Sequence, residues 1–521
     1  MNKISKYIVI ALCTIGFASC NKWLSDTSGD LLIPRSVTEF VPLLYGEGYP
    51  RSFNDDGAWI ALMTDDIEMG FLEHTHDAEY VSFDAASGGE GRRAFRWDAD
   101  IEEGITDMFW VRRYQNILGC NTIIVRLPHM LYTEAQVGLY HSLAARAYTL
   151  RAYNYFCLVN LYAMPWSPQN LNMPGVVIRT SPEITGEPIA RSSIEEVYKL
   201  IEADLTLAEY HMARAEVSAN RHFIGPQALM LLQTRVALFQ EKWDDVIQVG
   251  ERFLANNPAI RNLNAMGPEN ELGLGDAAFP FMFDLNNNPE IVFTFGNTNT
   301  SYNHLSTPTF NAGFGFRVSR PVPPGHPNYP SPNVPLMSLY EQDEYFDLRR
   351  LVYFRRNMPI TGNVTTFHYH YPMKYKSSSA GYRENWRTVE VYLNVAEAHA
   401  RRSSGVSEEA IELLNTLRIN RIRTTTFIPK TVADFANKEA LVQFIWDERR
   451  RELCFEEHHR WWDLRRQGMR QLEHREFVSN IEFDVYILPQ GSPNWVLEIP
   501  RSEVLFNDRI VGNNRVYINP S

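Results

Sequence analysis

Cysteine is scarce in this chain of 521 residues, which has only five. They are widely spaced, and that pattern argues against both a disulfide framework and a zinc site built from cysteine clusters. Basic residues are outnumbered by acidic ones, 50 against 62, so nucleic acid is not expected as a partner. Long apolar runs are also missing, since none approaches the roughly 20 residues that cross a bilayer. The composition is therefore that of an acidic, globular protein.

The one notable apolar run, residues 7–17, follows Lys6 and precedes two small residues and Cys20. A basic start, a short apolar run and small residues are typical of a secretory signal peptide, here residues 1–19. Small residues followed directly by Cys resemble the lipobox of bacterial lipoproteins, whose Cys receives a diacylglycerol. We therefore expect Cys20 to be lipidated and to anchor the mature chain through acyl groups. An ordinary signal peptide with a chance Cys is the alternative.

Helical patterns occupy both sides of a central segment. Apolar residues recur at spacings of three and four, and capping residues and prolines mark the ends. The patterns predict helices near residues 110–127, 133–164, 193–208, 227–240, 243–254, 388–402, 408–422 and 438–454. Paired helices of about 12–25 residues joined by short turns resemble tetratricopeptide units. The expected fold class is mainly α, with tetratricopeptide-like hairpins that form an α-superhelix.

The central segment, residues 261–386, has a different composition. It holds 20 aromatic residues between Phe281 and Trp386, together with many prolines and glycines. These features predict a large irregular insertion of loops and short strands, with packed strands at 279–285 and 290–296. The expected parts are therefore a helical N-terminal part at 20–260, the insertion at 261–386 and a helical C-terminal part at 387–521.

Four stretches carry a resemblance to one known family. They are "ARAYTLRAYNYFCLVNLYAMP" (145–165), "VEVYLNVAEAHAR" (389–401), "ERRRELCFEEHHRWWDLRRQG" (448–468) and "LEIPRSEVLFNDRIVGNN" (497–514). In this order they resemble the long N-terminal helix, the E-V-Y-L motif, the strongest signature and the terminal segment of the SusD/RagB family. Members of that family are nutrient-uptake lipoproteins of the bacterial outer membrane.

The resemblance implies a surface lipoprotein that captures oligosaccharide and delivers it to a SusC-like, TonB-dependent transporter barrel. It also implies a ligand site built from loops before the first long helix and from the central insertion. Rings suit this task because sugars lay their apolar faces on them. The candidates that lie among small and polar neighbours are Tyr80, Arg96, Trp97, Tyr302, Phe314 and Phe316. We expect Trp97 and Tyr302 to be exposed rings that face one site.

Signals for catalysis or metal binding are weak. No nucleophile elbow, phosphate loop or dinucleotide fingerprint is present, so neither an enzyme nor a cofactor is expected. "EHTHD" (73–77) and "HYHY" (368–371) each place two His on one side of an extended segment, but neither offers a third metal ligand. The carboxylates Asp65 and Asp66 are interpreted as a chance pair. No metal site is expected.

The C-terminal signature also has two interpretations. Its two adjacent His and its Arg residues could hold a metal or a phosphate, but adjacent side chains on a helix point in different directions. We expect instead a charged helix end that packs on the rest of the protein, with Trp462 and Leu464 in the core. Two functions then stay open: the glycan-binding lipoprotein, and a helical scaffold that binds a protein partner or a peptide nutrient without a glycan site.

Overall fold

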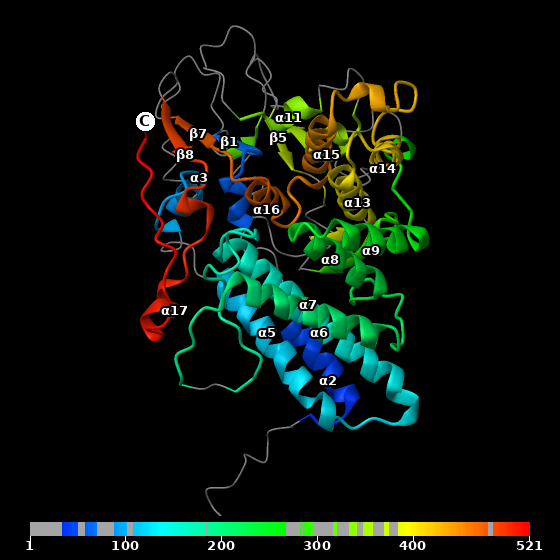
Figure 1. Cartoon of the computed structure of the whole chain (residues 1–521), viewed down its shortest axis with the longest axis vertical. Coiled ribbons are helices and arrows are strands. Elements are labelled where there is room, and N and C mark those ends of the chain that lie inside the picture. The colour runs from blue at the N-terminus through cyan, green and yellow to red at the C-terminus, as the bar shows by residue number, and fades with distance from the viewer. Residues whose placement is uncertain are drawn as a thin grey trace, which may run out of the picture.

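The structure is a computed structural model of the chain. It describes residues 34–50, 58–69, 88–101, 108–183, 186–266, 282–283, 285–295, 316–319, 333–340, 347–357, 369–372, 374, 384–477 and 483–520. Helices dominate these residues, and the mainly helical fold expected from the sequence is confirmed (Figure 1). The predicted signal peptide and Cys20 lie outside the described residues. No helix in the described ranges combines the length and apolarity that a membrane span requires.

The predicted helices are confirmed, and most of their ends lie within a few residues of the expected ones. Before the insertion the helices are α2 Val37–Leu43, α3 Gly88–Phe95, α5 Met108–Arg126, α6 Val137–Tyr162, α7 Ile194–Met212, α8 Pro226–Phe239 and α9 Trp243–Asn256. Two short helices belong to the insertion, α11 Leu336–Leu339 and α12 Arg349–Val352. The C-terminal helices are α13 Thr388–Arg402, α14 Glu408–Arg418, α15 Lys438–Leu453, α16 His459–Arg466 and α17 Arg501–Phe506.

Local capping explains several of these boundaries. At the start of α7 the Ser193 hydroxyl accepts a hydrogen bond from the Glu196 amide at 3.2 Å, while the Glu196 carboxylate accepts from the Ser193 amide at 2.7 Å. Thr133 and Gln136 form a similar box before α6. These helices therefore begin where side chains can accept hydrogen bonds from the backbone amides of the first turn, which have no partner inside the helix.

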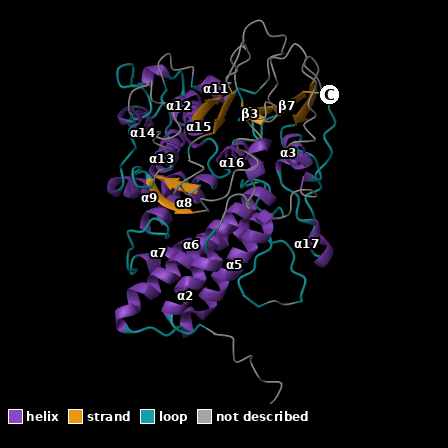
Figure 2. Ribbon diagram, turned by 180° about the vertical axis from the view of Figure 1, so that it is seen from behind, coloured by secondary structure: helices purple, strands orange, loops and turns teal. Residues whose placement is uncertain are grey.

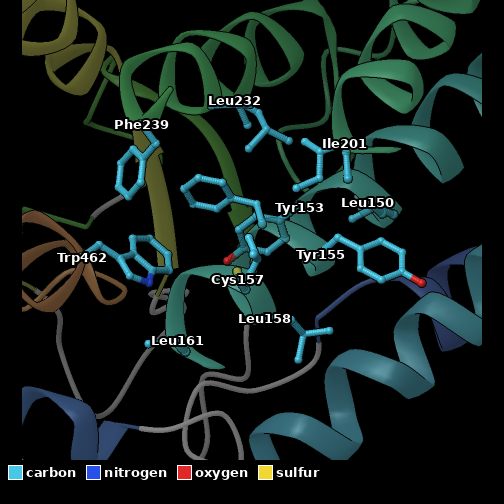
Figure 3. Close-up of a cluster of buried hydrophobic side chains, with 14 of the residues drawn as sticks. Leu150, Tyr153, Tyr155, Cys157, Leu158, Leu161, Ile201, Leu232, Phe239 and Trp462 are labelled. Atoms are coloured by element: carbon cyan, nitrogen blue, oxygen red, sulfur yellow. The ribbon is translucent and has the colours of Figure 1, made fainter. Parts of the chain in front are cut away.

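Helix α6 is the centre of the molecule. Almost every residue from Ser142 onward is buried, and α5 and α7 pack on its two sides. Figure 3 shows its apolar side chains meeting α7, α8 and α16, where Trp462 faces Phe156 and Phe239. Trp462 and Leu464 are each 1% exposed, as predicted. The three described cysteines, Cys120, Cys157 and Cys454, are buried and free.

One helix crossing joins the parts of the chain on either side of the insertion, and one strand pair joins the insertion to the start of the C-terminal part. Helix α9 crosses α13 so closely that a Cβ on Gly250 would lie 2.2 Å from a methyl carbon of Val395, which explains the glycine at this position. Strand β2 (Ile291–Phe295) pairs antiparallel with β6 (Glu384–Arg387). The helices before and after the insertion therefore form one continuous helical body (Figure 2).

The described strands are short and pair two by two. They are β1 Ile67–Met69 with β3 Phe316–Val318, β2 with β6, β4 Phe354–Asn357 with β5 Tyr369–Pro372, and β7 Leu472–Phe477 with β8 Phe483–Leu488. The strand predicted at 290–296 is confirmed. The strand predicted at 279–285 is wrong at Met282 and Phe283, which form a turn, although both side chains are buried as expected.

Candidate functional site

The two regions expected to form a ligand site meet at one end of the molecule. Strand β1 lies before the first long helix, and β3 belongs to the central insertion. They pair antiparallel, with Met69 opposite Phe316 and Ile67 opposite Val318. Strand β7 lies beside β1 at the same end (Figure 1). Residues that are about 250 positions apart in the sequence are thus neighbours here, and we call this region the β1–β3 end.

Trp97 is not the exposed ring expected from the sequence. Its side chain is fully buried, its indole N–H donates to the Met63 carbonyl at 2.9 Å, and its ring stacks on His474 with centroids 4.1 Å apart. Its backbone, at φ 55°, ends α3 in the left-handed region. The side chain of Asn494 donates to its carbonyl at 2.8 Å. A fully buried ring cannot stack on a ligand, so Trp97 is part of the core beneath the proposed site and does not line that site.

Arg96 remains partly exposed at the β1–β3 end. Its guanidinium donates to the buried carboxylate of Glu476, with one contact at 2.6 Å, and lies 5.0 Å from the ring centre of Tyr486. Arg92 binds the same carboxylate. Two guanidinium groups therefore share the one carboxylate of Glu476. The partly exposed cations are suited to donate hydrogen bonds to an oxygen-rich ligand.

The other candidate residues are not tested by the structure. Tyr80, Tyr302 and Phe314 lie outside the described residues, as does the "EHTHD" segment. Phe316 is described only through its backbone in β3, which places it opposite Met69. The roles predicted for these four rings therefore stay predictions. In "HYHY", residues 369–371 belong to β5, which agrees with the extended conformation expected there.

The C-terminal signature forms a buried network of charges. The carboxylate of Glu452 accepts from Arg421 at 2.9 Å, from Arg387 at 2.9 Å and from the Tyr353 hydroxyl at 2.9 Å, and all these groups are buried. Arg349 adds a contact at 3.2 Å. The network joins α15 to the insertion, to β6 and to the end of α14. The charges of the signature therefore hold separate segments together.

These carboxylates are poor candidates for proton transfer. Burial alone would raise the pKa of Glu448, but Arg349, Arg451 and Arg418 outweigh burial and lower that pKa to about 2. Burial would likewise raise the pKa of Glu452, but Arg421 and Arg387 lower it well below its usual value. Both groups remain ionised at neutral pH and already have their donors, so neither can act as a general acid.

The two His residues of the signature are buried parts of the same region, as expected. His459 lies 3.3 Å from a guanidinium nitrogen of Arg449. Both His rings meet the Trp462 ring edge-on, with ring centres 5.7 Å away for His459 and 5.4 Å away for His458. Within the described residues, no group of three or more His, Cys, Asp or Glu is arranged to hold a metal ion.

Asp65 and Asp66 also form ion pairs with Arg residues of the C-terminal signature. Asp65 accepts two hydrogen bonds from Arg460 at 2.7 Å, and Asp66 accepts one from Arg450 at 2.7 Å. These contacts fix the segment before β1 on α15 and α16. The sequence alone suggests a chance pair, because the Arg partners lie 384 and 395 positions away and leave no local signal of this role. The same is true of Glu476, which lies 384 positions from Arg92.

Two family models match the chain. One, described as the SusD family, matches residues 337–513, and the other, described as "Starch-binding associating with outer membrane", matches residues 75–221. The first covers the C-terminal signature and its network, and the second covers α3 to α7. None of the curated proteins matches the chain in sequence.

Several solved structures share the fold. A SusD superfamily protein from Bacteroides thetaiotaomicron is 18% identical, with a TM-score of 0.66 over 92% of this chain and 100% of its own. A SusD-like carbohydrate binding protein from Bacteroides vulgatus is 18% identical, with a TM-score of 0.62 over 91% and 97%. A SusD superfamily protein from Bacteroides fragilis is 19% identical, with a TM-score of 0.63 over 91% and 99%.

Proposed function

This chain belongs to the SusD/RagB family, and from that premise we propose that it is a glycan-binding lipoprotein of the outer membrane surface. In this proposal it captures oligosaccharide and delivers it to a TonB-dependent, SusC-like transporter barrel. The starch-binding description of one matching family model and the carbohydrate-binding relative support the ligand class. The description of the same family model also names association with the outer membrane, which supports the proposed location.

The pairing of β1 with β3 is the observation that carries the proposal. It joins the segment before the first long helix to the insertion, which are the two sources of the predicted ligand-binding rings. Arg92 and Arg96 add partly exposed donors that share the Glu476 carboxylate, and Arg96 also lies over the Tyr486 ring. We propose that Tyr80, Tyr302, Phe314 and Phe316 supply stacking rings at this end, with Arg96 as a polar contact.

The opposite end of the helical body suits the membrane side. The first described residue, Pro34, lies there, next to the bridge between Ser36 and Leu131. A lipid on Cys20 would hold residue 34 within about 50 Å of the membrane, because 14 extended residues span at most about 3.6 Å each. Leu131 and Val217, each 62% exposed, mark apolar surface at this end. We propose that this surface contacts the transporter barrel. The lipid on Cys20 and the short segment up to residue 34 would hold this surface close to the membrane in which the barrel lies.

We propose that the protein acts by binding and performs no chemistry. The carboxylates of the signature support this, because they are buried, ionised and fully engaged by Arg. A scaffold that binds only protein is the second candidate function. Exposed apolar residues near α6 and α7 support it, because such residues suit a protein partner of either kind, a transporter barrel or another protein.

Glycan binding and transporter docking can be tested separately. The mature chain from residue 21, without the anchor, is applied to a glycan array, and positive glycans are measured by calorimetry. The lipidated protein is pulled from detergent-solubilised outer membranes, and copurifying barrel proteins are identified. We expect both a glycan ligand and a barrel partner.

The matched variants are Tyr302→Ala at the proposed site and Tyr210→Ala on α7, an exposed ring in the helical body. Only Tyr302→Ala should weaken glycan binding. A barrel partner without any glycan ligand would replace the proposal by the scaffold. A glycan ligand whose affinity falls for Tyr210→Ala and not for Tyr302→Ala would move the site to the helices.

A further inference from the structure

The outer face of α5 carries a pocket that the proposed glycan site does not use. It is lined by residues of α5, of the segment 177–183, and of α17 with the residues after it. In Figure 2, α5 and α17 lie below β3 and β7, which mark the β1–β3 end. Its volume is about 360 Å³, which is at the lower end of the range for small-molecule sites. Apolar and aromatic side chains form much of its wall: Trp110, Tyr114, Ile117, Leu118, Val177 and Ile510.

Hydrogen bonds hold the wall of the pocket in place. The Tyr114 hydroxyl donates to the Val177 carbonyl at 2.7 Å, and the Asn121 amide donates to the Arg179 carbonyl at 2.9 Å. From α6, the Tyr155 hydroxyl donates to the same Arg179 carbonyl and accepts from the Arg179 amide, both at 2.8 Å. The backbone of Arg179 is therefore fixed by side chains of two helices, and the pocket is formed before any ligand arrives.

Three charged residues line the wall, Arg179, Glu183 and Glu503, and of these Glu183 is exposed to solvent. The guanidinium of Arg179 and the carboxylate of Glu503 are partly buried, yet in the described part of the chain neither makes an ion pair or a side-chain hydrogen bond. Both act on the hydroxyl of Tyr114. Burial, then Tyr155 and Glu503, raises the pKa of Tyr114 well above its usual value, and Arg179 opposes that rise.

The contrast with nearby charges is informative. Between α6 and α7, Arg151 and Asp204 form a buried ion pair with a contact of 2.6 Å. Arg179 and Glu503 instead line the same largely apolar pocket and, in the described part of the chain, make no ion pair with each other.

We propose that this pocket binds a small zwitterion with an apolar side chain, of the amino-acid class. The ligand carboxylate would lie on the Arg179 guanidinium, which is suited to bidentate contact, and the ligand ammonium on the Glu503 carboxylate. The apolar side chain would pack on the faces of Tyr114, Ile117 and Leu118 and leave water.

Ligands of other charge types fit less well. A fatty acid would satisfy Arg179 but bury Glu503 without a partner, and an organic cation would do the reverse, which is costly in each case. A neutral sugar would neutralise neither charge. Only a molecule that carries both charges on a small apolar body satisfies the two partly buried groups together, and the exposed carboxylate of Glu183 adds to the attraction for the ammonium. The proposal does not depend on glycan binding at the β1–β3 end.

Blocked amino acids test each charge on the unaltered protein. Calorimetry on the mature chain from residue 21 compares L-phenylalanine with N-acetyl-L-phenylalanine, which lacks the ammonium, and with L-phenylalaninamide, which lacks the carboxylate. L-leucine is measured as a second apolar amino acid. We expect both amino acids to bind and each blocked form to bind about ten- to a hundredfold more weakly, as for the loss of one charged hydrogen bond.

Two variants then assign the contacts. Arg179→Met should weaken binding of L-phenylalanine and abolish its advantage over the amide, whereas Glu503→Gln should abolish its advantage over the acetylated form. Arg509→Ala removes an exposed cation outside the pocket wall and should change nothing. Melting temperatures of all variants should match the parent, because the removed charges have no partners.

Three results would overturn the proposal. One is the lack of any binding heat for L-phenylalanine and L-leucine at millimolar concentration. Another is equal affinity of the parent protein for free L-phenylalanine and for its two blocked forms. This comparison does not depend on whether a variant folds. The third is binding that persists unchanged in both Arg179→Met and Glu503→Gln.

Discussion

Trp462 connects the C-terminal signature to the central helix, and its removal tests the packing of the whole core. The ring is 1% exposed and meets Phe156 of α6 edge-on, with centroids 5.4 Å apart, and Phe239 of α8 at 6.3 Å (Figure 3). Its indole nitrogen has no hydrogen-bond partner in the described part of the chain. Truncation to alanine therefore removes packing and leaves no broken hydrogen bond behind.

Trp462→Ala should lower the free energy of unfolding by about 3–5 kcal/mol, the usual cost of emptying a buried tryptophan site. The entropy of unfolding is about 2.1 cal/mol/K per residue, so a mature chain of roughly 500 residues that unfolds as one unit has about 1 kcal/mol/K. The melting temperature should then fall by about 3–5 °C in scanning calorimetry.

A matched control separates packing from the mere loss of a ring. Phe506 is 91% exposed, and Phe506→Ala should leave the melting temperature unchanged. If Trp462→Ala melts with the parent, the ring is not part of the core, and the contacts between α16 and α6 described above are wrong.

Three further outcomes follow. Cys20→Ala should abolish fatty-acid labelling and release a folded protein from the outer membrane fraction, and continued labelling would exclude Cys20 as the lipid site. Tyr302→Ala should weaken glycan binding about five- to a hundredfold at constant melting temperature, as for loss of one stacked ring; unchanged affinity in calorimetry would remove it from the site. Trp97→Ala should lower the melting temperature, because the ring is buried against His474, and an unchanged temperature would place it at the surface.

The helices could be predicted because their signals are local. The capping box of Ser193 and Glu196 spans three residues, and the apolar spacing of α6 lies within one segment. The burial of Trp462 was predictable for a related reason, since the signature is a continuous stretch that resembles a known motif. Such features depend on neighbours within one or two helical turns.

Burial of a side chain outside such motifs depends on distant residues, and the prediction that Trp97 is exposed was wrong for this reason. Trp97 lies among small and polar neighbours, which predicted a loop ring, but Asn494, 397 positions away, donates to its carbonyl, and His474 covers its face. The placing of Arg179 and Glu503 in one pocket wall gives no sequence pattern, because the two residues are 324 positions apart and only the fold brings residues 177–183 and α17 to α5. Contacts of this kind are set by the fold as a whole.

The charge network of the signature makes a prediction about acid. Glu448 accepts from Arg349 at 2.7 Å and from Arg451 at 2.6 Å, and these cations, with Arg418, lower its pKa from 4.5 to about 2 against the opposing effect of burial. An unfolded chain would bind the proton near pH 4.5. The carboxylate therefore stabilises the fold fully above about pH 4.5, and this contribution, about 3 kcal/mol, is lost as the pH falls from 4.5 to 2.

Glu448→Gln isolates that contribution from the other carboxylates of the protein. At pH 7 the variant should be less stable in urea by at least about 3 kcal/mol, because it also leaves buried Arg charges without their partner. Between pH 4.5 and 2 the gap between parent and variant should narrow, since the parent carboxylate is losing its charge. Glu412→Gln, an exposed position on α14, should follow the parent at every pH. A gap that is constant from pH 7 to 2 would mean that the charge of Glu448 does not stabilise the fold, and that the network acts only through packing.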